Sequence, residues 1–219
     1  MASVVTRRAV AGSPATVGRL QCRHRCGGGR HVRPGCSRVR YLPRSGAAPG
    51  ADDNASGSVA VLVAADILSQ YQWGCTLRFA LWTGEEQGWL GSRVYAARSK
   101  TNRENIKGYL NLDSIAWNSR PPQSLNLYWT SRVPASQNIA DLFVGVIGAY
   151  GLDLLPFKFD AVDFTYGHIS DNAQFWSEGY PAIWVLEDLN DGNGPIYHSP
   201  RDRMSALDMG KRPANHTFR

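Results

Sequence analysis

Two adjacent carboxylates, Glu85 and Glu86, follow an apolar run, LRFALW, at residues 77–82. Neighbouring like charges repel one another, and burying either carboxylate without a partner is costly. The pair can be the solvated first turn of a helix, where acidic residues are favourable. It can also belong to a metal site, in which one carboxylate binds the cation and the other moves protons. The hexapeptide TGEEQG alone favours the helix start.

Other residues supply further candidate ligands, namely Asp53, Asp113 and His198. Each has an ordinary structural explanation, because acids commonly cap turns and helices and a loop histidine is commonly exposed. Taken together, carboxylates with a histidine form a set that a borderline cation such as zinc accepts. Burying several acids without a cation is costly, so the group as a whole favours a metal site.

Alternating helix and strand patterns are expected to position these residues. Glu85, Glu86 and Asp113 follow strand patterns, His198 lies in the loop after the last strand, and Asp53 enters a helix. Apolar strands alternating with helices predict an α/β fold, with a mixed, mostly parallel sheet between helices. Polar sites in such sheets gather at the carboxyl ends of the strands. The helix patterns are 59–70, 89–99, 136–151 and 171–180, and the strand patterns are 76–83, 106–114, 124–131 and 181–188.

Five segments of the chain resemble successive blocks of the M28 family of zinc aminopeptidases. The resemblance runs over roughly residues 47–209 and implies a zinc-dependent exopeptidase fold that removes residues from peptide N-termini. GADDNASG followed by WTGEEQG and NLD is a far more specific combination than any of its parts. The segments are APGADDNASGS, RFALWTGEEQGWLGSRVYA, GYLNLDS, SDNAQFWSEGYPAIWVLED and PIYHSPRDRMSALDM.

The resemblance also implies a role for each candidate residue in a centre of two zinc ions. Asp53 would bridge the two ions, Glu86 and His198 would bind one of them, and Asp113 would bind the other. Glu85 would be the general base for a metal-activated water, whose pKa falls to about 7 on zinc. Adjacent side chains at a twisted strand end point in different directions, so Glu86 can face the metal while Glu85 faces the water.

The chain departs from the family pattern in several places. The H-x-D-S block, which normally brings a histidine to the second zinc, is absent, and His24 and His31 lack its neighbours. Asn172 stands where the family often has the histidine of SDH, and the helix expected after residue 209 is missing. These departures predict an incomplete domain with one complete metal site.

Charge separates a basic leader, residues 1–46, from the rest of the chain, where the resemblance implies an M28-like catalytic domain, residues 47–210, followed by a tail, residues 211–219. The first 50 residues hold ten Arg and no Asp, Glu or Lys, and they account for the net charge of +6. We expect this leader to be disordered or aberrant, and not to bind nucleic acid, because it has no interleaved aromatic residues. No apolar stretch is long enough to span a membrane. No secretory signal is evident, so an extracellular location is implied by the family alone.

Three functions remain open. The first is a two-zinc aminopeptidase that acts on peptides. The second is a single-zinc enzyme of the glutaminyl cyclase type, an acyl transfer enzyme, which needs only Asp53, Glu86 and His198. The third is an inactive fragment that has lost one or both metals. Aromatic residues could line a substrate pocket but are more often core, so no substrate preference is predicted. They are Trp89, Trp117, Trp129, Phe164 and Trp176.

Overall fold

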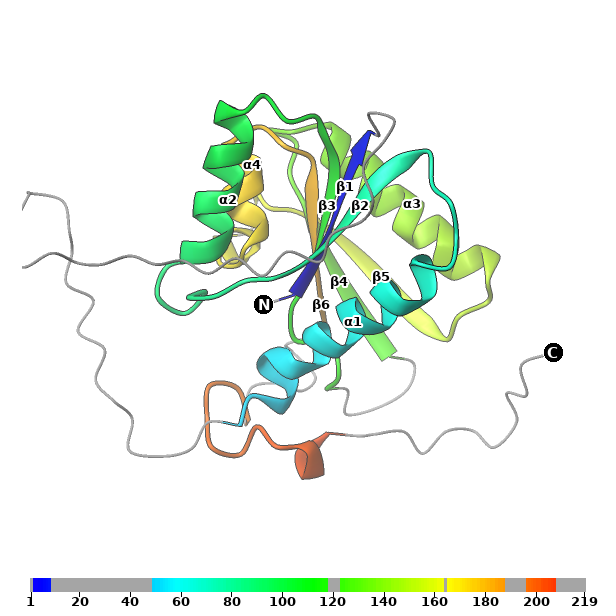
Figure 1. Cartoon of the computed structure of the whole chain (residues 1–219). Coiled ribbons are helices and arrows are strands. Elements are labelled where there is room, and N and C mark those ends of the chain that lie inside the picture. The colour runs from blue at the N-terminus through cyan, green and yellow to red at the C-terminus, as the bar shows by residue number, and fades with distance from the viewer. Residues whose placement is uncertain (1, 9–48, 118–122, 164, 188–195, 208–219) are drawn as a thin grey trace, which may run out of the picture.

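A single mixed sheet organises the computed structural model, which describes residues 2–8, 49–117, 123–163, 165–187 and 196–207. In this described part the sheet has six strands in the order β2-β1-β3-β6-β4-β5 (Figure 1). The strands are β1 (Ala2–Arg8), β2 (Cys75–Leu81), β3 (Ile106–Leu112), β4 (Gln123–Trp129), β5 (Leu154–Asp160) and β6 (Ala182–Glu187).

Strand direction decides where the functional loops emerge. β1 is antiparallel to both β2 and β3, so β2 and β3 run in the same direction. β6 is parallel to β3, whereas β4 is antiparallel to β6 and parallel to β5. The carboxyl ends of β2, β3 and β6 therefore lie at the same end of the sheet. The prediction of an α/β fold with a mixed sheet between helices is confirmed.

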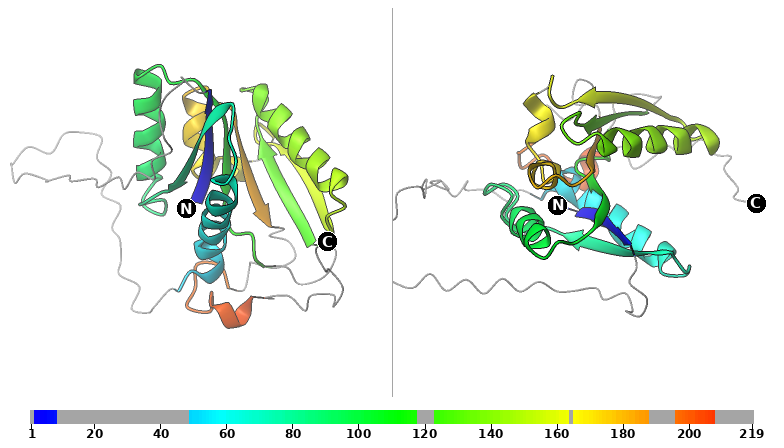
Figure 2. Two further views of the ribbon diagram at one scale, coloured as in Figure 1. Left: turned by 45° about the vertical axis from the view of Figure 1, so that its right-hand side comes forward. Right: turned by 90° about the horizontal axis from the view of Figure 1, so that it is seen from above.

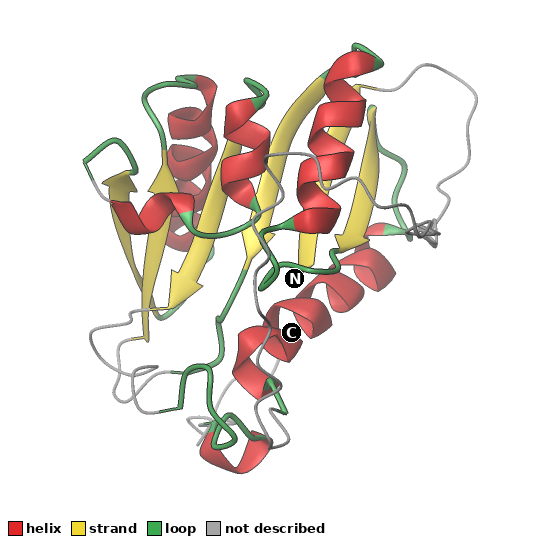
Figure 3. Cartoon of the chain, turned by 90° about the vertical axis from the view of Figure 1, so that its left-hand side faces the viewer, coloured by secondary structure: helices red, strands yellow, loops and turns green. Residues whose placement is uncertain are grey.

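Helices pack on both faces of this sheet (Figure 2, Figure 3). On one face α2 and α4 cover an aromatic core in which the rings of Tyr109 and Phe175 stack 3.8 Å apart. On the other face α3 covers aliphatic residues such as Leu127 and Ile183. None of the helices in these described segments is long and apolar enough to cross a membrane. The helices are α1 (Gly57–Leu68), α2 (Leu90–Thr101), α3 (Ala135–Ala149) and α4 (Asn172–Ser177), with short turns η1 (Ala51–Ser56), η2 (Thr165–His168) and η3 (Met204–Ala206).

All eight helix and strand patterns of the sequence form the expected elements, but β5 was not predicted. Its sequence, LLPFKFD, contains Pro156, which lacks a backbone donor, and Lys158, which interrupts the apolar run. Among the described strands, β5 lies at the edge of the sheet and pairs only with β4, and a proline is tolerated in such an edge strand.

β1 lies within the segment predicted to be a disordered or aberrant leader, and its residues 2–8 form a strand inside the sheet. Its backbone pairs with β2 on one side and with β3 on the other. Val4, Val5 and Thr6 favour extended backbone, but the strand is completed only by partners far along the chain. The rest of the predicted leader, residues 9–46, and the tail lie outside the described residues.

Candidate metal centre

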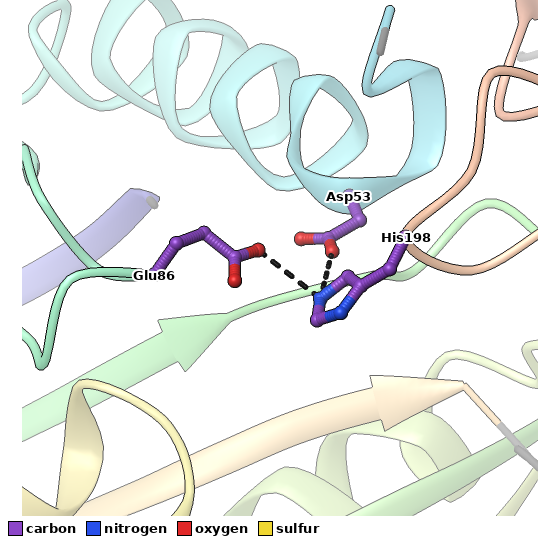
Figure 4. A group of neighbouring side chains, drawn as sticks. All are labelled: Asp53, Glu86 and His198. Carbon is purple, nitrogen blue, oxygen red and sulfur yellow. Dashed lines mark ion pairs between the residues drawn. The ribbon is translucent and has the colours of Figure 1, made fainter. Parts of the chain in front are cut away.

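Three potential metal ligands converge beyond the carboxyl ends of β2, β3 and β6 (Figure 4). The Nε2 atom of His198 lies 3.2 Å from Asp53 Oδ2 and 3.1 Å from Glu86 Oε1. One ligand atom from each residue falls within 4.8 Å of the other two. The three side chains come from η1, from the turn after β2, and from the loop that follows β6.

The turn η1 holds Asp53 against the end of β3. The side-chain amide of Asn54 donates to the carbonyl of Leu112 over 2.8 Å, and its oxygen accepts the Gly57 N–H over 2.9 Å. The carboxylate of Asp202 accepts the N–H groups of Asp52 and Asp53 over 2.8 and 3.0 Å. Because Asp202 follows His198 closely in sequence, these two hydrogen bonds join the turn of Asp53 to the loop of His198.

A tight turn after β2 separates the directions of Glu85 and Glu86. Gly84 has a φ of 67°, in the left-handed region that glycine adopts without steric cost. Glu85 Oε1 accepts a hydrogen bond from the Trp89 indole N–H over 2.8 Å, whereas Glu86 faces His198. Burial, followed by the charges of Asp113 and Asp171, raises the pKa of Glu85 to about 9. Without a cation, Glu85 is therefore protonated at neutral pH.

Asp113 lies directly after β3, with only 4% of its surface exposed. Its Oδ2 accepts a hydrogen bond of 2.6 Å from Ser170 Oγ, which in turn accepts one of 2.7 Å from the Asn111 side-chain amide. Burial, followed by the charge of Asp53, raises the pKa of Asp113 to about 8. Asp113 is thus close to Asp53 but does not belong to the group of three converging ligands.

The donor set of Asp53, Glu86 and His198 fits a zinc ion. Two carboxylate oxygens and one imidazole nitrogen are ligands that zinc accepts, and a catalytic zinc keeps a further position open. Burial and the charge of Glu86 raise the pKa of Asp53 to about 6, since both burial and a neighbouring like charge disfavour the ionised carboxylate. The side chains of His198 and Glu86 remain 41% and 46% exposed, which leaves the centre accessible.

The resemblance also implies a second metal, held by Asp113 and by Asp53. The structure describes these two residues, whereas His24 and His31 lie outside the described residues. The carboxyl end of β1 lies beside Cys75 and Ile106, the first residues of β2 and β3, and therefore at the end of the sheet opposite the metal centre. The roles assigned to Asp53, Glu85, Glu86, Asp113 and His198 stay predictions.

Tyr197 is a further residue of the centre that the sequence analysis did not select. Its ring stacks on that of His198, with centroids 3.7 Å apart. Burial, followed by the charges of four carboxylates, raises the pKa of its hydroxyl far above the ordinary value, so the phenol keeps its proton. Its position next to His198 in sequence is the one signal that could have identified it. The four carboxylates are Asp53, Asp113, Glu86 and Glu85.

The candidate pocket aromatics have different surroundings. Trp89 lies in the centre, through its bond to Glu85. Trp176 is buried and donates to the carbonyl of Ala182, and Trp129 packs against the core under α3. Trp117 packs beside Ile196 and Leu207, and Phe164 lies outside the described residues. Only Trp89 therefore bears directly on the site.

Comparison with known proteins places the chain in a family. The model of peptidase family M28 matches residues 38–216, and the chain belongs to this family. A leucine aminopeptidase 1 of Trichophyton rubrum is 32% identical over 178 residues, which cover 76% of this chain and 46% of that protein. A probable leucine aminopeptidase of Arthroderma benhamiae is 30% identical over 174 residues, covering 76% and 45%. The chain thus spans about half the length of these curated relatives.

Solved structures show the same fold. The LapA structure of Legionella pneumophila has a TM-score of 0.61 at 21% identity, covering 73% of this chain and 43% of that one. The structure of BSAP, a zinc aminopeptidase from Bacillus subtilis, has a TM-score of 0.55 at 23% identity, covering 73% and 38%. At this level of identity the similarity concerns the fold alone.

Proposed function

We propose that this protein is a zinc-dependent aminopeptidase, which hydrolyses the first peptide bond of a peptide. The observation that carries the proposal is the convergence of Asp53, Glu86 and His198 from three separate loops. Glu85 lies next to Glu86 in the chain but accepts a hydrogen bond from Trp89 instead. Membership of family M28 and the names of the curated leucine aminopeptidases support the same activity.

The residues of the centre divide the chemistry among them. When bound, zinc supplies a Lewis acid that polarises the substrate carbonyl and lowers the pKa of water and of nearby carboxyls. Asp53, Glu86 and His198 would hold the ion. Glu85, as the carboxylate, accepts a proton from the attacking water and passes it to the leaving amine. The protonated phenol of Tyr197 donates a hydrogen bond to the carbonyl oxygen as that oxygen gains negative charge.

The test combines elemental analysis with an aminopeptidase assay on the purified protein. We expect at least one zinc per chain and hydrolysis of leucine 4-nitroanilide, with no hydrolysis of its N-acetyl derivative. Glu86→Ala should lose both zinc and activity, whereas Gln87→Ala, in the same turn, should keep both. A protein that contains no zinc, or that cleaves both substrates equally, would contradict the proposal.

A single-zinc acyl transfer enzyme of the glutaminyl cyclase type is the second candidate. The observation in its favour is that one group of three potential ligands converges among the described residues, and Asp113 is not part of this group. This enzyme would bind one zinc and release ammonia from a peptide with N-terminal glutamine. Mass spectrometry of that product, together with the number of zinc ions per chain, separates the two functions.

A further inference from the structure

We propose that Glu187 is a positioning residue for the zinc centre, which acts through Asp52 to hold the turn of Asp53 in its metal-binding orientation. The proposal rests on the proposed function, because it takes Asp53 to be a zinc ligand. Glu187 itself does not touch the three converging ligands.

Glu187 is the last residue of β6, and it is fully buried. Its backbone N–H donates to the Ser114 carbonyl over 2.9 Å, next to Asp113. Its side-chain Oε2 accepts the Trp117 N–H over 2.5 Å, and its carboxyl group lies against that of Asp52. Glu187 therefore joins β6, the segment after β3 and the turn η1.

Asp52 is equally buried and is held from several sides. Its Oδ1 accepts the Ala116 N–H over 2.9 Å, and its own N–H donates to Asp202 Oδ1. The peptide unit between Asp52 and Asp53 is thus fixed by Asp202 from one direction and, through the Asp52 side chain, by Glu187 from another. Asp53 is the next residue in the chain, so its carboxylate takes its direction from this anchor.

The two carboxyl groups complete each other's hydrogen bonding. Among the described residues, neither Asp52 Oδ2 nor Glu187 Oε1 has a hydrogen-bond donor. A proton shared between the two carboxyls satisfies both oxygens. Burial, followed by contact with Asp52, raises the pKa of Glu187 to about 10, so the protonated carboxyl is available as a donor at neutral pH. A glutamine at this position would keep the same donor and acceptor arrangement.

Removing Glu187 therefore removes a support from the Asp53 turn while leaving every ligand in the chain. Outer partners of metal ligands typically change metal affinity by about 10- to 100-fold when they are lost. A buried acceptor or donor left without a partner is also destabilising. The turn would retain its contacts with Asn54 and Asp202 but would lose its link to β6.

The experiment compares Glu187→Met with Glu187→Gln in the full chain. Methionine keeps the length of the side chain and removes both hydrogen bonds, and we expect it to weaken zinc binding by about 10- to 100-fold. Glutamine accepts from Trp117 and donates to Asp52, so its zinc affinity should stay within about threefold of wild type. Zinc affinity is measured by competition with a chelator. Should Glu187→Met not fold, Glu187→Asp, which is too short to reach Asp52, takes its place.

A second readout needs no metal. In the zinc-free protein, hydrogen exchange at the amides of Asp52, Asp53 and Ala116 should accelerate in Glu187→Met and not in Glu187→Gln. Glu104→Ala is the matched control, because this partly buried carboxylate bonds Arg78 and Ser99 at the other end of the sheet. It should change stability without changing zinc affinity.

The outcomes separate this proposal from the proposed function. Wild-type zinc affinity in Glu187→Met overturns the proposal, and so does a loss in Glu187→Gln as large as in Glu187→Met. If the wild-type protein binds no zinc, the proposed function fails, and the exchange rates of the zinc-free protein still decide whether Glu187 holds the turn.

Discussion

At the scale of single residues, the adjacent pair Glu85 and Glu86 has two separate environments. Glu86 remains 46% exposed beside His198, whereas Glu85 lies against the Trp89 indole with a strongly raised pKa. The backbone turn, and not the residue type, distinguishes the two carboxylates. Substituting each in turn should therefore have different consequences.

Glu85→Gln should abolish most peptide hydrolysis while leaving zinc bound. The amide keeps an acceptor for the Trp89 indole but cannot take up a proton, and loss of general base catalysis typically costs about 10²- to 10⁴-fold in rate. Steady-state kinetics and elemental analysis on the same preparation check this. If Glu85→Gln lost its zinc as Glu86→Ala does, Glu85 would be a ligand and not a base.

The zinc-free protein should become less stable as the pH rises from about 5 to about 8. Burial raises the pKa of Glu85 to about 9 and of Asp113 to about 8 in the folded chain. Over this range both carboxyl groups keep their protons in the folded state but lose them in the unfolded state. The free energy of unfolding therefore decreases as the pH rises. Urea unfolding in EDTA at the two pH values measures the effect. A midpoint that rises over this range would contradict it.

The candidate ligands could be selected from the sequence because acids and a histidine beside strand patterns are visible there. Tyr197 and Glu187 could not be selected in the same way. The role of Tyr197 depends on its stacking against His198, and that of Glu187 depends on a buried contact with Asp52, 135 positions earlier in the chain. Such contacts arise only when separate elements pack together.

At the scale of elements, the start of α1 lies unusually close to the end of β3. A Cβ atom added at Gly57 would lie 2.1 Å from the Leu112 carbonyl oxygen and 2.6 Å from Asn54 Oδ1. Side-chain atoms cannot occupy such a distance, so glycine is what allows the turn of Asp53 to reach the strand that ends at Asp113. The geometry of the centre therefore depends on this contact between two elements.

Gly57→Ala should destabilise the protein by about 1–3 kcal/mol or more and should weaken zinc binding, because backbone at the centre must move. Gly145→Ala is the matched control, since this glycine lies within α3 and a Cβ there would meet nothing within 4 Å. Alanine at that position should stabilise the helix by up to about 1 kcal/mol. Chemical denaturation of both variants measures the difference. Equal changes in the free energy of unfolding for Gly57→Ala and Gly145→Ala would show that Gly57 does not pack tightly against the Leu112 carbonyl.

The elements themselves were largely predictable, because helices and buried strands have local periodic patterns. The two strands that were not predicted, β1 and β5, are those whose sequences do not carry such a pattern. Pro156 and Lys158 interrupt β5, and β1 contains Arg7 and Arg8 beside its β-branched residues. These two segments form strands because they pair with other strands, and the local sequence pattern carries no information about such pairing.

At the scale of the whole molecule, the candidate ligands link parts of the chain that are distant in sequence. Asp53 and His198 are separated by 145 positions, and Glu86 lies between them. A zinc ion bound by all three would join η1, the turn after β2 and the loop after β6. Binding to the folded state alone stabilises that state by mass action.

Zinc should therefore raise the thermal unfolding temperature in a concentration-dependent way. At a zinc concentration about 100 times its dissociation constant the expected stabilisation is about 2.7 kcal/mol. Differential scanning fluorimetry with zinc and with EDTA measures it, and Glu86→Ala should abolish the shift while Gln87→Ala keeps it. A shift of equal size in Glu86→Ala would place the bound zinc elsewhere on the chain.

β1 also sets the order in which the molecule can be completed during synthesis. Residues 2–8 leave the ribosome long before their partners at residues 75–81 and 106–112. Among the described strands, β1 alone joins β2 to β3 in the sheet. The nascent segment must stay without its final partners until about half of the chain has been made, and contacts at such sequence separation form slowly. A stalled or truncated chain that ends before β3 would leave one side of β1 open to pair with the same strand of another molecule.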